Sequence, residues 1–284
     1  MYGSQFVDLA YENNIGYFIT DLFFTRPWFS RLLGGLEDSH FSARKIAPFV
    51  AQYGIDMNDY EPSQYQSFNQ FFIRKFKAGK RNFKPEANVF CAGAEARYYG
   101  FENFNAGSKV QVKGIDVTPT ELVGNAALGA EFNEGTILIA RLCPTDYHRF
   151  HFPVSGKLIH QSTVHGQLHS VNPTALRKKP DVFLKNERHV SIIENPVFGK
   201  IAMIEVGAIG VGKIIQSCQF PDSSSSLLFE KGSEKGYFLF GGSTVIWLLQ
   251  KGKISLSSDL RENSIRGLET WIPLGDSLGE HRGS

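Results

Sequence analysis

The residues best suited to covalent chemistry lie in the segment Phe240–Val245, which reads FGGSTV. Two glycines permit backbone conformations that other residues resist, and the Ser243 hydroxyl can attack the carbonyl of Gly242. The attack would convert the peptide bond into an ester by an N→O acyl shift. β-Elimination and hydrolysis would then leave a pyruvoyl group at residue 243 and release ammonia. The same pattern is also typical of a plain hairpin turn, so the motif alone does not decide between the two.

Two histidines, His148 and His151, lie close together in the segment Asp146–Pro153, which reads DYHRFHFP. Their imidazoles could supply a general base and a proton donor near neutral pH. Positions three apart on an extended strand face opposite sides. Both rings therefore reach one site only if the segment bends.

A zinc hydrolase is an alternative interpretation of the histidines, because a second close pair follows at His165 and His169. Four imidazoles could bind zinc. No acidic residue or cysteine stands beside them in a recognisable zinc signature, so the sequence does not favour a metal site.

The elements that must position these residues change in character along the chain. The first 80 or so residues indicate helices, with Ile15, Phe18, Ile19 and Leu22 at helical spacing. From about Val89 the apolar runs are short, β-branched or aromatic, and separated by turn residues. The runs predicted as strands are Thr136–Ala140, His189–Ile193, Ile201–Val206, Tyr237–Phe240 and Thr244–Leu249. We therefore expect an α+β protein in which an N-terminal helical region packs on a β-rich body resembling a sandwich or barrel.

The overall composition excludes several classes of protein. The net charge is only +2, which gives no argument for binding nucleic acid. Three widely spaced cysteines indicate reduced thiols, and we expect neither a signal peptide nor a membrane-spanning helix. Attraction to an anionic surface would have to come from a local basic cluster, for which the candidates are Arg74, Lys75, Lys77, Lys80 and Arg81.

Taken together, these patterns resemble the phosphatidylserine decarboxylase family. The resemblance runs from about residue 8 to residue 255 in the order that the family shows. The blocks that carry it read FNQFFIRK from Phe68, VKG from Val112, ELVG from Glu121, DYHRFHFP from Asp146, LHSVNP from Leu168, NER from Asn186, VGAIGVG from Val206 and KGSEKGYFLFGGSTV from Lys231. Each block is weak by itself, and their joint occurrence is what indicates the family.

The resemblance implies a division of the chain and a role for three residues. Ser243 would be the nucleophile of self-cleavage and the precursor of a covalent pyruvoyl cofactor, with no external cofactor required. His151 would be the base that activates it, and His148 the proton donor in decarboxylation. Cleavage between Gly242 and Ser243 would give a β chain, 1–242, and an α chain, 243–284. A helical, membrane-associating region would span 1–82 and the decarboxylase domain 83–284.

The acidic partner expected of such a serine and histidine is less clear. The corresponding stretch reads CAGAEAR from Cys91, and the best alignment places Glu95 at the acidic position. Glutamate can orient a histidine as aspartate does, but its extra methylene changes the geometry. Glu95 is therefore the predicted partner, although it could instead be a surface residue.

The resemblance also implies the substrate and the setting. The substrate would be phosphatidylserine, converted to phosphatidylethanolamine and CO2 through a Schiff base with the pyruvoyl carbonyl. The chain would act as a peripheral protein, and possible homodimer, on an anionic membrane surface at the cytoplasmic side. Two alternatives stay open: a soluble decarboxylase of a free aromatic amino acid such as tryptophan, and a non-catalytic relative that binds anionic lipid.

Overall fold

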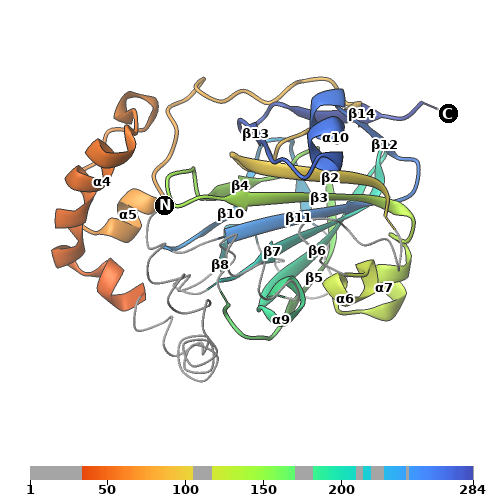
Figure 1. Ribbon diagram of the computed structural model, residues 1–284, viewed down its shortest axis with the longest axis horizontal. Coiled ribbons are helices and arrows are strands. Elements are labelled where there is room, and N and C mark those ends of the chain that lie inside the picture. Colours follow the sequence, from red (N-terminus) through yellow and green to blue (C-terminus); the bar gives the residue numbers. More distant parts are fainter. Residues whose placement is uncertain are drawn as a thin grey trace.

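The fold is described by a computed structural model of the 284-residue chain (Figure 1). The residues that it describes are 34–104, 117–169, 182–208, 214–218, 227–240 and 243–283. The helices predicted before residue 33, the family blocks at 112–114 and 170–173, and Gly242 lie outside these ranges.

The helical part near the N-terminus is built around aromatic side chains. It contains the 3-10 helices η2 (His40–Lys45) and η3 (Met57–Asp59) and the α-helices α4 (Ile46–Tyr53) and α5 (Phe68–Phe72). Helix α4 ends at Gly54, whose φ of 60° is in the left-handed region that favours glycine. The Ser67 hydroxyl accepts a hydrogen bond from the amide of Gln70 and begins α5. These helices pack through Phe49, Phe68, Phe71 and Phe72, all of them buried.

An eight-stranded antiparallel sheet forms the body of the protein, with the order β13-β2-β3-β11-β7-β6-β5-β9. Its strands are β2 (Ala96–Phe104), β3 (Gly135–Leu142), β5 (Gly156–Val164), β6 (Arg188–Asn195), β7 (Gly199–Val206), β9 (Leu227–Phe229), β11 (Ser243–Leu249) and β13 (Thr270–Ile272). Every residue of the central strand β11 is buried. A strand covered on both faces needs a continuous apolar run rather than an alternating one, and TVIWLL after Ser243 provides it.

Two three-stranded sheets and several short helices complete the body. One sheet has the order β4-β10-β8, from Arg149–His151, Glu234–Phe238 and Ile214–Gln216, and the other has the order β1-β14-β12, from Val89–Cys91, Ser277–His281 and Ile254–Leu256. The helices are α6 (Pro119–Val123), α7 (Ala126–Ala130), α9 (Val182–Lys185) and α10 (Ser258–Ile265). Figure 1 shows α4 and α5 at one end of the body and α10 beside β13. The predicted α+β class is confirmed, and four of the predicted strands match β3, β6, β7 and β11. The fifth, Tyr237–Phe240, overlaps β10 only at Tyr237 and Phe238, because β10 ends at Phe238.

A buried ion pair joins the sheet β4-β10-β8 to the eight-stranded sheet. The Lys235 ammonium on β10 donates to both carboxylate oxygens of Glu205 on β7, each at 2.9 Å, and to Gln216 Oε1 at 2.8 Å. Gln216 donates in turn to Glu205 Oε2 at 2.8 Å. The Lys235 and Glu205 side chains are fully buried, and burial lowers the pKa of Lys235 while the carboxylate opposes that shift. The two charges are tolerated there because each one satisfies the other.

Removal of the ammonium alone is expected to destabilise the fold strongly. We expect Lys235→Met to lower the free energy of unfolding by about 3–5 kcal/mol, because the Glu205 charge is left buried without a cation. The double variant Lys235→Met/Glu205→Gln should recover most of the loss. Urea unfolding measures both, in a Ser243→Ala background that removes the predicted nucleophile of self-cleavage.

Lys200 is the matched control, because it also lies on β7 but pairs with Glu131 where both side chains are about one-third exposed. Lys200→Met should change stability little. A loss as large as that of Lys235→Met would show that burial of the Lys235 pair is not what matters.

Candidate active site

Ser243 is the first residue of β11 and pairs with Leu142 on β3. Its side chain is fully buried, and within the described ranges its hydroxyl has no hydrogen-bond partner. The chain reaches it from β10, which ends at Phe238, so the connection 239–242 crosses from one sheet to another. On the α5 side of this connection the Asn69 side chain accepts a hydrogen bond from the Phe240 amide at 2.7 Å. The described residues before and after the predicted scissile bond, Phe240 and Ser243, are therefore each held by a hydrogen bond or a strand pairing.

The strand register shows on which face the Ser243 side chain lies. Side chains alternate along a strand, so Ser243 points to the same face as Val245, which pairs with Glu205 on β7. Glu205 is the residue that Lys235 contacts from the sheet β4-β10-β8. The hydroxyl thus faces the space between the two sheets, where water is scarce and electrostatic interactions are strong.

His148 lies in the loop between β3 and β4 and is completely buried. Its Nδ1 is 2.9 Å from the carbonyl oxygen of Asp146, which can only accept, so Nδ1 carries the proton and Nε2 the lone pair. Nε2 has no partner in the described part of the chain. The ring lies on Phe72 of α5 with 3.8 Å between centroids. Burial lowers the pKa of His148 to about 3, so the imidazole is neutral at physiological pH.

The loop before His148 is fixed by charged side chains. The Asp146 carboxylate accepts from the Cys143 amide at 2.7 Å and from Arg97 at 3.0 Å. The Arg74 guanidinium donates to the carbonyl of Thr145 at 2.9 Å and stacks on the Tyr60 ring. Arg74 is only 2% exposed, so its assignment to a surface basic cluster was wrong. Its guanidinium instead donates to a backbone carbonyl of the loop that carries His148.

His151 and Glu95 make separate contacts in this structure. His151 Nδ1 is 2.8 Å from the carbonyl of Gly232, and Nε2 is 3.4 Å from the Tyr147 hydroxyl. Burial lowers the pKa of His151. The Glu95 carboxylate lies against Arg81, with Oε2 2.5 Å from Nε and Oε1 3.1 Å from Nη2.

The four predicted catalytic side chains are therefore not joined by hydrogen bonds to one another within the described residues. The fold brings His148 beside α5 and the Asp146 loop, and it places His151 on β4. The Glu95 carboxylate is held by the Arg81 guanidinium.

The four histidines of the zinc alternative are not gathered into a metal site. His165 is 86% exposed beside Glu187, and the His169 ring is 2.7 Å from the Gln167 side chain. Among the residues the structure describes, no three His, Cys, Asp or Glu side chains are grouped so that they could hold a metal ion.

Asn69, Phe72 and Arg74 support the site. The sequence marked neither Asn69 nor Phe72 as functional, and it suggested Arg74 only as part of a surface basic cluster. Asn69 holds the Phe240 amide, Phe72 covers His148, and Arg74 fixes the loop at Thr145. All three belong to the FNQFFIRK block. The block was visible as a resemblance, but its contact with residues 70 to 170 positions away was not.

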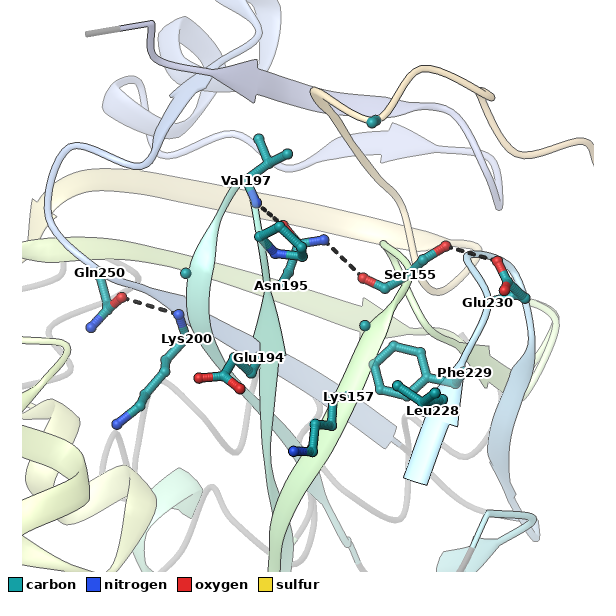
Figure 2. A pocket seen from close by; sticks show the side chains of 14 residues that line it. Ser155, Lys157, Glu194, Asn195, Val197, Lys200, Leu228, Phe229, Glu230 and Gln250 are labelled. Carbon is teal, nitrogen blue, oxygen red and sulfur yellow. Dashed lines mark hydrogen bonds between the residues drawn. The ribbon is translucent and has the colours of Figure 1, made fainter. Parts of the chain in front are cut away.

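A pocket of about 990 Å³ lies elsewhere on the eight-stranded sheet (Figure 2). Asn195 shapes it by donating to the carbonyl of Ser155 and accepting from the amide of Val197, and Lys200 lines it on β7. Lys200 lies six residues from Val206, which pairs with Thr244. At 3.3 Å per residue this is roughly 20 Å along the strand, so this pocket is separate from the Ser243 end of the sheet.

Comparison with known proteins identifies the family. The sequence profile of the family described as phosphatidylserine decarboxylase matches residues 68–268. The chain belongs to the phosphatidylserine decarboxylase family. It is 39% identical over 279 residues to a protein of Clostridium botulinum (strain Hall) named phosphatidylserine decarboxylase proenzyme, with 98% of this chain and 93% of that protein covered. Proteins of the same name from Clostridium perfringens (strain ATCC 13124) and Clostridium tetani are each 38% identical. They cover 98% of this chain, and 93% and 92% of those proteins.

The family assignment covers every described residue of the candidate site. Ser243, His148, His151 and Glu95 all lie inside the matched range. The resemblance seen in the sequence is confirmed as family membership. No helix among the described residues is long and apolar enough to cross a membrane.

The buried neutral state of His148 has a consequence for stability. The ordinary pKa of 6.5 applies to the unfolded chain and about 3 to the folded one, so the unfolded chain binds more protons between these values. Stability should therefore fall as the pH is lowered below 6.5. We expect the His148 contribution to cost about 2 kcal/mol between pH 7 and pH 5.

Urea unfolding of Ser243→Ala at the two pH values, with and without His148→Gln, measures this contribution. The carboxylates are common to both chains, so the difference between the two pH dependences isolates His148. The exposed His165→Gln is the control and should leave the dependence intact. Identical slopes with and without His148 would contradict the assignment.

Proposed function

We propose that this chain is a self-cleaving proenzyme whose processed form converts phosphatidylserine to phosphatidylethanolamine and CO2. The observation that supports it most directly is the fully buried Ser243 hydroxyl, which has no partner in the described part of a chain of this family. Leaving a buried hydroxyl without a hydrogen bond costs about 1–3 kcal/mol, so its presence in a folded protein calls for an explanation. A reactive role for the hydroxyl supplies one.

The proposed cleavage uses the crossover between the two sheets. The Ser243 oxygen attacks the carbonyl carbon of Gly242 while His151 removes the hydroxyl proton. The C–N bond then breaks as the amide nitrogen takes a proton, which leaves an ester between Gly242 and Ser243. Loss of the Ser243 α-proton expels the Gly242 carboxylate and separates the chains. Hydrolysis of the resulting enamine releases ammonia.

The residues around Ser243 fit a small carbonyl cofactor at this position. The hydroxyl site is buried without a competing partner among the described residues, and His148 presents a buried Nε2 lone pair. When formed, a pyruvoyl group at residue 243 would supply an electron sink for the bond that releases CO2. His148 would hold a proton at Nε2 only briefly, because its low pKa makes the protonated ring a strong acid. The Nε2 lone pair would therefore have to take up a proton during the reaction before it could deliver one.

The strand ladder would hold the products of cleavage together. In the proposed α chain, 243–284, β11 pairs on one side with β3 and on the other with β7, both in the proposed β chain. Further ladders join β13 to β2 and β14 to β1. Dissociation would expose the apolar β11, so the two chains should remain one particle after cleavage.

Substitutions at three residues should separate self-cleavage from decarboxylation. We expect Ser243→Ala to leave one intact and inactive chain, because no hydroxyl is present to attack Gly242. His151→Ala should block cleavage as well, whereas His148→Ala should lower CO2 release from phosphatidylserine by about 10²–10⁴-fold and slow cleavage much less. Intact-mass spectrometry gives the cleavage and labelled CO2 the reaction.

The wild-type protein is the reference and should give two chains, the smaller one of 42 residues blocked at its N-terminus. A wild-type chain that stays at full length under native conditions would refute self-processing. Normal cleavage of His151→Ala would show that another group is the base.

Glu95 is the proposed acidic partner of His151, and it would have to exchange Arg81 for the imidazole to act. We expect Glu95→Gln to slow cleavage several-fold, because a neutral amide stabilises the imidazolium less. Arg81→Gln should leave cleavage intact or accelerate it by releasing the carboxylate. The time course of chain separation measures both.

Thermal unfolding of the same two variants provides the control. If Glu95 serves only to bind Arg81, both variants should lower the melting temperature alike without a selective effect on cleavage. That result would remove Glu95 from the site.

The membrane setting is also a proposal. We propose a helical, membrane-associating region over 1–82 and a decarboxylase domain over 83–284, acting at an anionic surface as a peripheral protein and possible homodimer. Exposed Leu36 and Phe41 in the helical part support contact with lipid. Their location close to α5, which touches His148, would bring that contact to the candidate site.

A further inference from the structure

Three large apolar side chains are exposed within a short stretch at the C-terminal end of α10. Ile265 is 73% exposed, Leu268 is 47% exposed and Trp271 is 51% exposed. Figure 1 shows that α10 lies directly beside β13, the strand that carries Trp271. Large apolar residues gathered in this way mark an interaction surface more often than a chance exposure.

The backbone under these side chains is anchored, so their exposure is built into the fold. The Ser264 hydroxyl accepts from the Gly100 amide at 2.9 Å and donates to the carbonyl of Leu260. The Tyr99 hydroxyl donates to the carbonyl of Gly267 at 3.0 Å. These bonds hold the segment against β2 while Ile265 and Leu268 point away from it.

The position of Trp271 in the sheet relates this surface to the candidate site. Trp271 pairs with Arg97, Arg97 with Arg141, and Arg141 with Thr244, the neighbour of Ser243. Three strand spacings of about 4.8 Å put Trp271 roughly 14 Å from Thr244 across the sheet. The exposed tryptophan therefore lies at the same end of the sheet as Ser243, on the face to which Thr244 points and opposite to that of the Ser243 side chain.

The charges on this surface balance. Arg261 and Arg266 are exposed there together with Asp259 and Glu262, while Arg97 is bound to Asp146. Two positive and two negative side chains leave the surface near neutral. Attraction to a partner must then be apolar, with the arginines reaching to the polar side of the boundary.

We propose that Ile265, Leu268 and Trp271 form a membrane contact of the C-terminal chain. They insert into the headgroup boundary of a bilayer and bring the Ser243 end of the sheet to it. A tryptophan flanked by aliphatic residues and arginine is suited to that boundary, where one side of the ring is apolar and the other is wet. The inference rests on the proposed function only in taking the substrate to be a bilayer lipid.

The test compares one headgroup in two physical states. Purified, processed protein is assayed with long-chain phosphatidylserine in vesicles and with a short-chain phosphatidylserine below its micelle concentration. In the double variant Leu268→Ser/Trp271→Ser, the rate on vesicles should fall about tenfold or more, since burial of these side chains is lost. The rate on the monomeric substrate should not change.

Leu228→Ser is the matched control. Leu228 is 78% exposed on β9, the opposite edge of the same sheet. It pairs with Lys157, Lys157 with Glu194 and Glu194 with Lys200, at the far end from Ser243. This variant removes a leucine that is even more exposed than Leu268 and should retain the full rate on both substrates.

A spectroscopic measurement tests the contact itself. Vesicles that contain brominated phospholipid should quench the fluorescence of wild-type protein more than that of Trp271→Phe, because bromine quenches only indoles near the bilayer. The Trp271-dependent part of vesicle binding should persist at 0.5 M salt, unlike binding through a basic cluster, which screening weakens (Debye length about 3 Å at 1 M).

The outcomes separate this inference from the proposed function. No CO2 from either substrate with wild-type protein would refute the proposed function. Wild-type activity on both, with equal rates for the double variant on vesicles, would overturn the membrane contact. An equal loss of rate on both substrates would show that the surface serves folding instead. Conversion of a dimer to a monomer in sedimentation, with the quenching unchanged, would show that it binds a second copy of the chain instead.

Discussion

The buried pair of Lys235 and Glu205 is the interaction on which the geometry around Ser243 depends. It ties β10 to β7, and β7 in turn pairs with β11. The chain leaves β10 at Phe238 and enters β11 at Ser243, so the separation that the pair imposes on the two sheets is the separation that residues 239–242 must span. Two apolar side chains could pack the sheets as well as an ion pair does, but they would not fix the register of one sheet against the other as a bidentate contact does. A self-cleaving bond requires that the attacking hydroxyl and the attacked carbonyl be held in a fixed relative position.

Burial, which makes each charge of the ion pair depend on the other, also determines the protonation state of His148. An imidazole without water nearby loses its charge, and the Asp146 carbonyl then decides which nitrogen keeps the proton. The carbonyl is held by a loop that Asp146 and Arg74 fix through the Cys143 amide and the Thr145 carbonyl. Protonation state and ring orientation thus follow from one set of contacts, and a single change in that loop would alter both.

Much of this arrangement follows from the sequence, and the remainder does not for identifiable reasons. The strands could be predicted because β-branched runs between turn residues are local signals. Ser243 is singled out only by the family blocks around it, because two glycines before a serine are equally typical of a hairpin turn. Arg74 could not be placed, since nothing in FNQFFIRK distinguishes a solvated arginine from one that serves the carbonyl of Thr145, 71 residues away. The spacing of His148 and His151 could not place the two rings, because only His151 lies on a strand and His148 lies in the preceding loop. For Glu95 the sequence offered an alignment but not its contact with Arg81, which lies 14 residues earlier in the chain.

The eight-stranded sheet has two unlike ends, and the difference indicates where a lipid must approach. At the far end lies an open pocket lined by Asn195 and Lys200, but no predicted catalytic residue contributes to it. At the other end, Ser243 is buried within the sheet stack, α5 covers His148, and Trp271 is exposed on β13, three strands from β11. A phospholipid cannot leave its bilayer for a buried serine without cost, because each methylene brought into water costs about 0.8 kcal/mol. The cost is avoided if the protein brings the serine end to the bilayer, and apolar side chains exposed at that same end are the means of doing so.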